Sequence, residues 1–193
     1  THDEHFTQDN GFVYGFTGAG VLFKADANSG YITWAKGFAK TSINNREVIW
    51  DAINFAASGY IKIYGDLVIS FMPDIQMLTA VNKNTGEIEW QTAFYKPQFF
   101  HDRGKSEFIY FSDASRSAGN SLFKVNPMDG NIIWQTSTQG VAIYGEGDIL
   151  DNKIYIPAEK SILILDQTTG HLTETIPLNV QPLKIRCSEI NSI

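Results

Sequence analysis

The side chains that could bind a metal or attack a substrate are few in this sequence, and their spacing suits neither task. His2, His5, His101 and His171 do not recur at the intervals of a metal-ligand set, except for the first two, which lie at the amino-terminal end. Cys187 is the single cysteine, which excludes an internal disulfide and leaves no Cys–His pair for nucleophilic catalysis. The sequence also lacks a serine elbow and a phosphate-binding loop. We therefore expect no catalytic residue and no metal site.

Two short segments look more reactive than the rest of the chain. Residues 26–30, DANSG, resemble the start of a calcium-binding loop, but Gly37 occupies the place of the bidentate glutamate that such a loop requires. Residues 101–106, HDRGKS, carry several charged side chains, yet they fall where a turn between two strands is expected. Both segments are better explained as turns than as binding sites.

The charge balance limits the classes of partner. With 15 Lys and Arg residues against 21 Asp and Glu residues, the net charge is −6, which argues against sequence-independent binding to DNA or RNA and is compatible with a basic protein partner. No apolar run approaches the ~18 residues of a membrane-spanning helix, and the polar first residues, THDEHFTQDN, contain no signal-peptide core. A lone cysteine favours a reducing compartment. We expect a cytoplasmic protein, or a periplasmic one if a signal peptide was trimmed.

One turn sequence recurs four times and indicates a repetitive fold. Aligned on Gly30, Gly86, Gly130 and Gly170, the copies lie 56, 44 and 40 residues apart. An Asp or Asn stands four residues before each glycine, where its side chain can bond to the backbone of the turn. The glycine supplies the positive φ of a short hairpin loop with a bulge. Because the spacing leaves room for four strands per copy, we expect an all-β propeller of four four-stranded blades.

The residue four positions after each glycine links the repeat to a known family. It is Trp in the first three copies and Glu174 in the fourth. This pattern resembles the tryptophan-docking repeat of quinoprotein (PQQ-like) β-propellers, and the resemblance covers most of residues 11–178. It implies that each indole packs onto the neighbouring blade, and that the contact at the last blade differs. The residues with this structural docking role are Trp34, Trp90, Trp134, Gly30, Gly86, Gly130 and Gly170.

The length of 193 residues suits a single domain spanning the whole chain. A C-terminal strand over 181–193 could close the ring, since an open set of blades would leave unpaired strand edges. The alternative is a fragment of a seven- or eight-bladed protein. The blades are expected at residues 5–40, 60–97, 98–138 and 139–180.

An insert at residues 41–59 breaks the repeat between the first two blades. Asn45 could cap a helix and Gly59 could end it, with Ile49 and Ile53 on one face. The sequence therefore predicts a short helix near 46–57, with an extended, irregular strand as the alternative.

The insert would lie on the same face as the loops that join the second and third strands of each blade. Loops on a rigid scaffold often carry function, and aromatic residues ringed by charges suit a protein interface. A partner is expected to bind this face through Trp50, Asp51, Phe55, Asp74, Asp113, Arg116 and Glu159.

Two classes of function follow from these observations. The first is a non-catalytic protein-binding scaffold, either an acidic immunity-type protein that neutralises a basic toxin or enzyme, or an envelope assembly adaptor as in the scaffold branch of the family. The second is a quinone (PQQ)-dependent dehydrogenase or a fragment of one. The enzymes of the family use larger discs and often an adjacent cysteine pair, and neither is present, so we expect no cofactor. The oligomeric state is not indicated.

Overall fold

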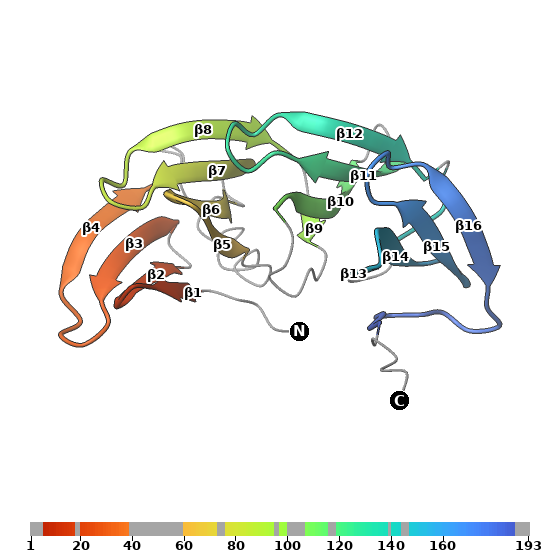
Figure 1. Ribbon diagram of the computed structural model, residues 1–193, viewed down its shortest axis with the longest axis horizontal. Helices are drawn as coiled ribbons and strands as arrows, with labels where there is room; N and C mark the ends of the chain where they lie inside the picture. Colours follow the sequence, from red (N-terminus) through yellow and green to blue (C-terminus); the bar gives the residue numbers. More distant parts are fainter. Residues whose placement is uncertain are drawn as a thin grey trace, which may run out of the picture. The chain divides into compact units, whose positions relative to one another are not determined.

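The chain is built from antiparallel β-strands and, over the described residues, contains no helix (Figure 1). The helix predicted near 46–57, like the whole insert at 41–59, lies outside those residues. The computed structural model describes residues 6–17, 20–38, 60–72, 76–94, 97–99, 107–115, 119–138, 140–143 and 147–187.

Two compact units make up the chain. The first is Thr1–Tyr95 with Pro127–Asn131, and the second is Lys96–Asn126 with Ile132–Ile193. The first unit holds two four-stranded sheets whose strands lie in sequence order. The strands of the first sheet are β1 (Phe6–Asp9), β2 (Phe12–Phe16), β3 (Val21–Asp26) and β4 (Ile32–Gly37), and those of the second are β5 (Ile61–Tyr64), β6 (Leu67–Met72), β7 (Met77–Asn82) and β8 (Ile88–Ala93).

The second unit repeats this plan with the third and fourth sheets, although the turn at Pro127–Asn131 in the third sheet belongs to the first unit. The prediction of four four-stranded sheets is thus confirmed. No strand pairing among the described residues joins the sheets into a ring, so closure stays a prediction. The strands of the third sheet are β9 (Pro97–Phe99), β10 (Ile109–Ser115), β11 (Gly119–Val125) and β12 (Ile132–Ser137), and those of the fourth are β13 (Asp148–Leu150), β14 (Lys153–Ala158), β15 (Ser161–Asp166) and β16 (Leu172–Pro177).

The last hairpins of the first, second and fourth sheets are shaped by the Asp or Asn four residues before their glycine. Asp26 Oδ1 accepts a hydrogen bond from the backbone N–H of Ser29 at 2.8 Å, and Gly30 follows with φ 71°. Asn82 Oδ1 accepts one from Asn84 N at 2.9 Å. The pairing of each outermost strand then shifts register close to the turn. The predicted hairpin with a bulge is confirmed.

The core lies on the inner and middle strands of each sheet, whereas the outermost strands are exposed. Strand β7 is buried along most of its length, and β16 is exposed along all of it. Removing apolar surface from water is the main force that holds each pair of sheets together. The buried cluster of the first unit is Tyr14, Leu22, Phe38, Ile61, Val68 and Val81, and that of the second is Tyr110, Leu122, Ile154, Ile156, Ala158, Leu163 and Leu165.

Of the strand predicted over residues 181–193, the structure describes residues 181–187, where Lys184 makes an isolated β-bridge and no continuous strand is formed. Gln181 Nε2 donates to the carbonyl oxygen of Ala158 at 3.1 Å, and the backbone N–H of Cys187 donates to Asp148 Oδ2 at 2.6 Å. Pro182 has no N–H to offer to a strand ladder. These two hydrogen bonds join the segment to the fourth sheet.

Candidate functional site

Three tryptophan side chains lie across the turn of the sheet that follows their own. Trp34, on β4, donates a hydrogen bond from Nε1 to the carbonyl oxygen of Lys83 at 3.1 Å. A Cβ placed on Gly86 would lie 2.9 Å from Cδ2 of the same ring, closer than real Cβ atoms approach. Glycine is therefore required both for the positive φ of the turn and for the space that the indole occupies.

The same contact recurs at the next two turns. Nε1 of Trp90 donates to the carbonyl oxygen of Pro127 at 3.0 Å, and Nε1 of Trp134 donates to that of Gln167 at 3.3 Å. A Cβ on either turn glycine would lie 2.5 Å from the nearest indole atom. In all three contacts the acceptor stands three residues before the turn glycine. Each indole thus joins its own sheet to the next by a hydrogen bond and a close apolar contact.

A threonine two residues after the Trp adds a second hydrogen bond that sequence reasoning missed. Thr92 Oγ1 donates to the carbonyl oxygen of Gly130 at 3.0 Å, and Thr136 Oγ1 donates to that of Gly170 at 2.6 Å. The letters WQT occur in both outer strands, and this shared signal could have identified the pair.

Two buried lysines, on β3 and β11, lie over aromatic rings. Lys24 Nζ is 4.0 Å from the ring centre of Phe12, and Lys124 Nζ is 4.2 Å from that of Phe108. The negative face of the ring attracts the ammonium group, while burial lowers the pKa of Lys124. Sequence reasoning missed these lysines too, although both stand in the shared letters LFK.

The turn of the first sheet has the same backbone conformation but no cover among the described residues. Gly30 has φ 71°, against 71–73° at the other three turn glycines. No described atom lies within 4 Å of a Cβ placed on it, and the adjacent Tyr31 and Ile32 are exposed. In the fourth sheet, Glu174 stands at the position that Trp occupies in the other three sheets, and it is also exposed.

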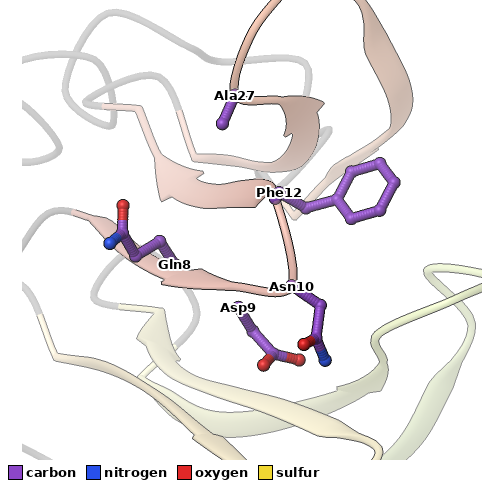
Figure 2. A pocket seen from close by; sticks show the side chains of 6 residues that line it. Gln8, Asp9, Asn10, Phe12 and Ala27 are labelled. Atoms are coloured by element: carbon purple, nitrogen blue, oxygen red, sulfur yellow. The ribbon is translucent and has the colours of Figure 1, made fainter.

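A pocket of about 310 Å³ adjoins this open turn (Figure 2). Its polar side is contributed by β1 and the turn that follows it, and its other side by β2 and the residue after β3. Asp9 Oδ2 accepts a hydrogen bond from Lys83 Nζ at 3.2 Å, and this bond raises the pKa of Lys83. The pocket is lined by Gln8, Asp9, Asn10, Gly11, Phe12 and Ala27.

No family model matches the sequence, and no curated protein matches it. Solved structures do match. BamB from Moraxella catarrhalis superposes with a TM-score of 0.59 at 19% identity, over 86% of this chain and 46% of that one. A europium-containing methanol dehydrogenase gives 0.61 at 15% identity over 89% and 41%, and the quinohemoprotein alcohol dehydrogenase from Comamonas testosteroni gives 0.59 at 13% over 89% and 34%. The fold is that of a β-propeller. The chain spans less than half the length of each of these matched structures.

Of the propeller residues predicted to bind a partner, the structure describes Asp113 and Glu159. Glu159 is exposed in the turn between β14 and β15. The loop position predicted for Asp113 is wrong, because this residue lies within β10, is 6% exposed and is paired on both sides. The polar run 112–121 suggested a loop, but β10 extends to Ser115 and β11 begins at Gly119, and the two strands pair in a ladder that satisfies their backbone groups. The remaining predicted residues, Trp50, Asp51, Phe55, Asp74 and Arg116, lie outside the described part of the chain.

The carboxylates at the ends of β3 and β15 serve the turns of the propeller. Hydrogen bonds from Ser29 lower the pKa of Asp26, and hydrogen bonds from Thr169 lower that of Asp166. Segment 26–30 therefore forms a turn, as predicted. Within the described ranges, no group of three His, Cys, Asp or Glu side chains could hold a metal ion, and no helix is long and apolar enough to cross a membrane.

The outer strands of the propeller each expose a large apolar residue at the same place, two positions after the turn glycine. Among the described residues, these side chains are the apolar surface that repeats with the fold. They are Ile32, Ile88, Ile132 and Leu172, which are 55%, 42%, 45% and 52% exposed.

Proposed function

We propose that the protein is a non-catalytic β-propeller scaffold that binds another protein. The observation that carries this proposal is the exposed apolar residue at the start of every outer strand. A single exposed isoleucine is ordinary, but the same position left exposed in all four sheets marks a surface that repeats with the fold. Apolar side chains among polar neighbours suit a protein interface, where they can serve as anchors.

Several charged groups at the turns support binding over catalysis, because the fold already uses them. Asp26 and Asp166 accept hydrogen bonds within their own turns. Lys83 Nζ lies 3.2 Å from the Asp9 carboxylate and 3.4 Å from that of Asp66. A general base or a nucleophile has to be available to the reacting group, and these side chains are occupied in holding the turns.

The net charge indicates the kind of partner. At −6, the protein would attract a basic protein through long-range electrostatics, which speeds encounter and weakens as salt is added. An acidic immunity-type protein that neutralises a basic toxin or enzyme in the cytoplasm has this property, and so does an envelope assembly adaptor with a basic partner. These finer roles are part of the proposal.

A pull-down from a native extract tests the binding function. We expect the tagged wild-type chain to retain a partner that is released at high salt, and Ile32→Lys with Ile88→Lys to lose it. The matched control is Thr33→Lys with Ala93→Lys, which adds the same charge to exposed positions of the same strands. The proposal fails if the wild-type chain retains nothing. Equal loss in both double variants would mean that charge, and not the apolar residues, controls binding.

A second pair of substitutions tests the surface predicted from the insert. If Trp50 and Phe55 anchor the partner, Trp50→Ala with Phe55→Ala should abolish retention and leave the melting temperature unchanged. If retention of the partner is unchanged, Trp50 and Phe55 are not part of the binding site, and the outer strands remain the proposed site.

A quinone-dependent dehydrogenase, or a fragment of one, is the second candidate, and the names of two matched structures favour it. Adding PQQ and calcium to the purified chain should then produce a bound chromophore and raise the melting temperature. If neither change appears, this candidate is excluded.

A further inference from the structure

The turn of the first sheet is a preformed copy of the turns that hold an indole. The backbone N–H of Ala27 donates to the carbonyl oxygen of Gly11 at 2.8 Å. The equivalent residues of the second and fourth sheets, Lys83 and Gln167, make the equivalent bond at the same distance. Since the φ of Gly30 also matches, the open turn needs no rearrangement to resemble a covered one.

The hydrogen-bond acceptor that an indole would use is also in place. The carbonyl oxygens of Lys83, Pro127 and Gln167 each accept a Trp Nε1–H, and Ala27 occupies the same position, three residues before Gly30. None of the described residues donates a hydrogen bond to the Ala27 carbonyl. Ala27 also lines the 310 Å³ pocket, so there is free space beside this acceptor.

We propose that the open turn is the docking site for the outer strand of a further propeller sheet, which lies ahead of β1 in the same polypeptide. That strand carries a Trp, whose Nε1–H donates to the Ala27 carbonyl and whose ring covers Gly30. Two residues later it carries a Thr, whose hydroxyl donates to the Gly30 carbonyl as Thr92 and Thr136 do at their turns.

The fourth sheet of this chain, or of a second copy, does not suit this role. Its outer strand presents Glu174 at the Trp position. An ionised carboxylate only accepts hydrogen bonds and has little apolar area, so it satisfies neither the Ala27 carbonyl nor the space above Gly30.

The order of the sheets indicates where the missing strand lies. At each of the three Trp contacts, the sheet that provides the indole directly precedes the sheet whose turn it covers. The same order at the first turn places the donor sheet ahead of β1. The matched propellers leave more than half of their own length beyond the aligned region, so further sheets have a place in this fold.

A peptide added to the 193-residue chain tests the docking chemistry. The probe is the β12 segment NIIWQTST, residues 131–138 of this sequence, titrated into the isotope-labelled protein and followed by NMR. We expect saturable shifts of the amide signals of Gly11, Ala27 and Gly30. A control peptide with Glu in place of Trp, which imitates β16, should give none. Equal shifts with both peptides, or shifts confined to other residues, would overturn the proposal.

Two variants of the chain separate docking from effects on folding. Gly30→Ala should weaken peptide binding about tenfold or more, since the added methyl would meet the ring. Gly140→Ala is the matched control, because Gly140 also has a positive φ and no described atom within 4 Å of an added Cβ. Melting temperatures of both variants check that the protein stays folded. Equal binding by the two variants would contradict the proposal.

Two further measurements test the source of the strand. If the docking strand is not β16, Glu174→Trp should leave the melting temperature unchanged. A rise in melting temperature that disappears when Gly30→Ala is added would show that β16 itself occupies the open turn. The coding sequence ahead of Thr1 should contain Gly-x-x-x-Trp-x-Thr, with its Gly 40 to 56 residues before Gly30, the range of spacings within this chain. A reading frame without this motif would overturn the assignment to the same polypeptide.

Discussion

The four turns share one backbone conformation but lie in two environments. The turn at Gly30 is open, whereas those at Gly86, Gly130 and Gly170 are covered by an indole. All four glycines have φ between 71° and 73°, but the last three are buried and Gly30 is exposed. The conformation of the turn is therefore set by its own Asp or Asn and Gly. Whether the turn is covered depends on one residue of another sheet, four positions after that sheet's own glycine.

This difference separates a feature that nearby residues determine from one that depends on another sheet. The hairpin loop is local, since the hydrogen bonds that its Asp or Asn side chain accepts come from residues two or three positions away. The cover is non-local, because Trp34 reaches Lys83 and Trp134 reaches Gln167. A sheet with a Trp is thus joined to its successor, and a sheet with Glu174 lacks this means of joining.

Removing an indole should have the largest effect on stability. Trp134→Ala takes away the hydrogen bond to Gln167 and leaves a space above Gly170, so we expect a loss of about 3 kcal/mol. Glu174→Ala, at the equivalent exposed position, should change stability by less than ~0.5 kcal/mol. Urea unfolding followed by circular dichroism measures both. A loss below ~1 kcal/mol for Trp134→Ala would show that cover contributes little.

Adding a methyl group to the turn glycines should separate backbone strain from cover. Gly30→Ala meets no described atom, so its cost is the positive φ alone, about 1–2 kcal/mol. Gly170→Ala has the same strain, and its Cβ also meets the Trp134 ring at 2.5 Å, which adds about 1–3 kcal/mol. Comparing the two unfolding free energies isolates the contact. Equal losses would mean that the indole moves aside without cost.

The extent to which sequence predicted these features follows the same division. The hairpin at Asn82 and Gly86 was predictable because its cause lies within a few residues. The role of Trp90 came from a family resemblance, and its acceptor, the Pro127 carbonyl, depends on a neighbouring sheet. Asp113 was misplaced because a polar composition suggests a loop, and only pairing with β9 and β11 shows that it is a strand.

The lysines were not predictable for a related reason. Lys24 and Lys124 lie on middle strands, where their polarity alone would suggest that they face solvent. Their burial depends on the rings of Phe12, at the start of β2, and Phe108, directly before β10. No local pattern shows that a ring on the next strand will lie under the ammonium group.

The covered turns are themselves not alike, and Lys124 provides a test of this. Its Nζ lies 3.4 Å from the Gln167 carbonyl that also accepts the Trp134 N–H, whereas Ala80 occupies the equivalent place beside Trp90. Burial lowers the pKa of Lys124 below 10.5 in the folded chain. Between the lowered pKa and 10.5, the Lys124 side chain is therefore protonated more often in the unfolded chain than in the folded one. Stability should therefore rise with pH through the window between the lowered pKa and 10.5.

Lys124→Met should remove this rise and keep the volume of the side chain. The control is Lys153→Met, at an exposed position of β14. Melting temperatures across alkaline pH measure the effect, which should be smaller than that of either substitution above. A rise that persists in Lys124→Met would assign the pH dependence to another group.

The smallest expected effect tests whether the turn is as local as the comparison indicates. Hydrogen bonds from Ser29 lower the pKa of Asp26 at the open turn, and those from Thr169 lower the pKa of Asp166 at a covered one. A lowered carboxyl pKa stabilises the folded state above the ordinary value of 3.8, and this contribution is lost as the pH falls through the folded pKa. Asp26→Asn and Asp166→Asn should both reduce the acid sensitivity of unfolding, because Asn keeps the acceptor and does not titrate, as Asn82 shows at its own turn.

If the turns are local, the two substitutions should act alike even though only one turn lies beneath an indole. Asp166 should show the slightly larger change, since the charge of His171 further lowers its pKa. Urea unfolding from neutral pH to below pH 3.8 provides the measurement. A large acid effect at Asp166 with none at Asp26 would mean that cover, and not hydrogen bonding within the turn, determines how these carboxylates stabilise the fold.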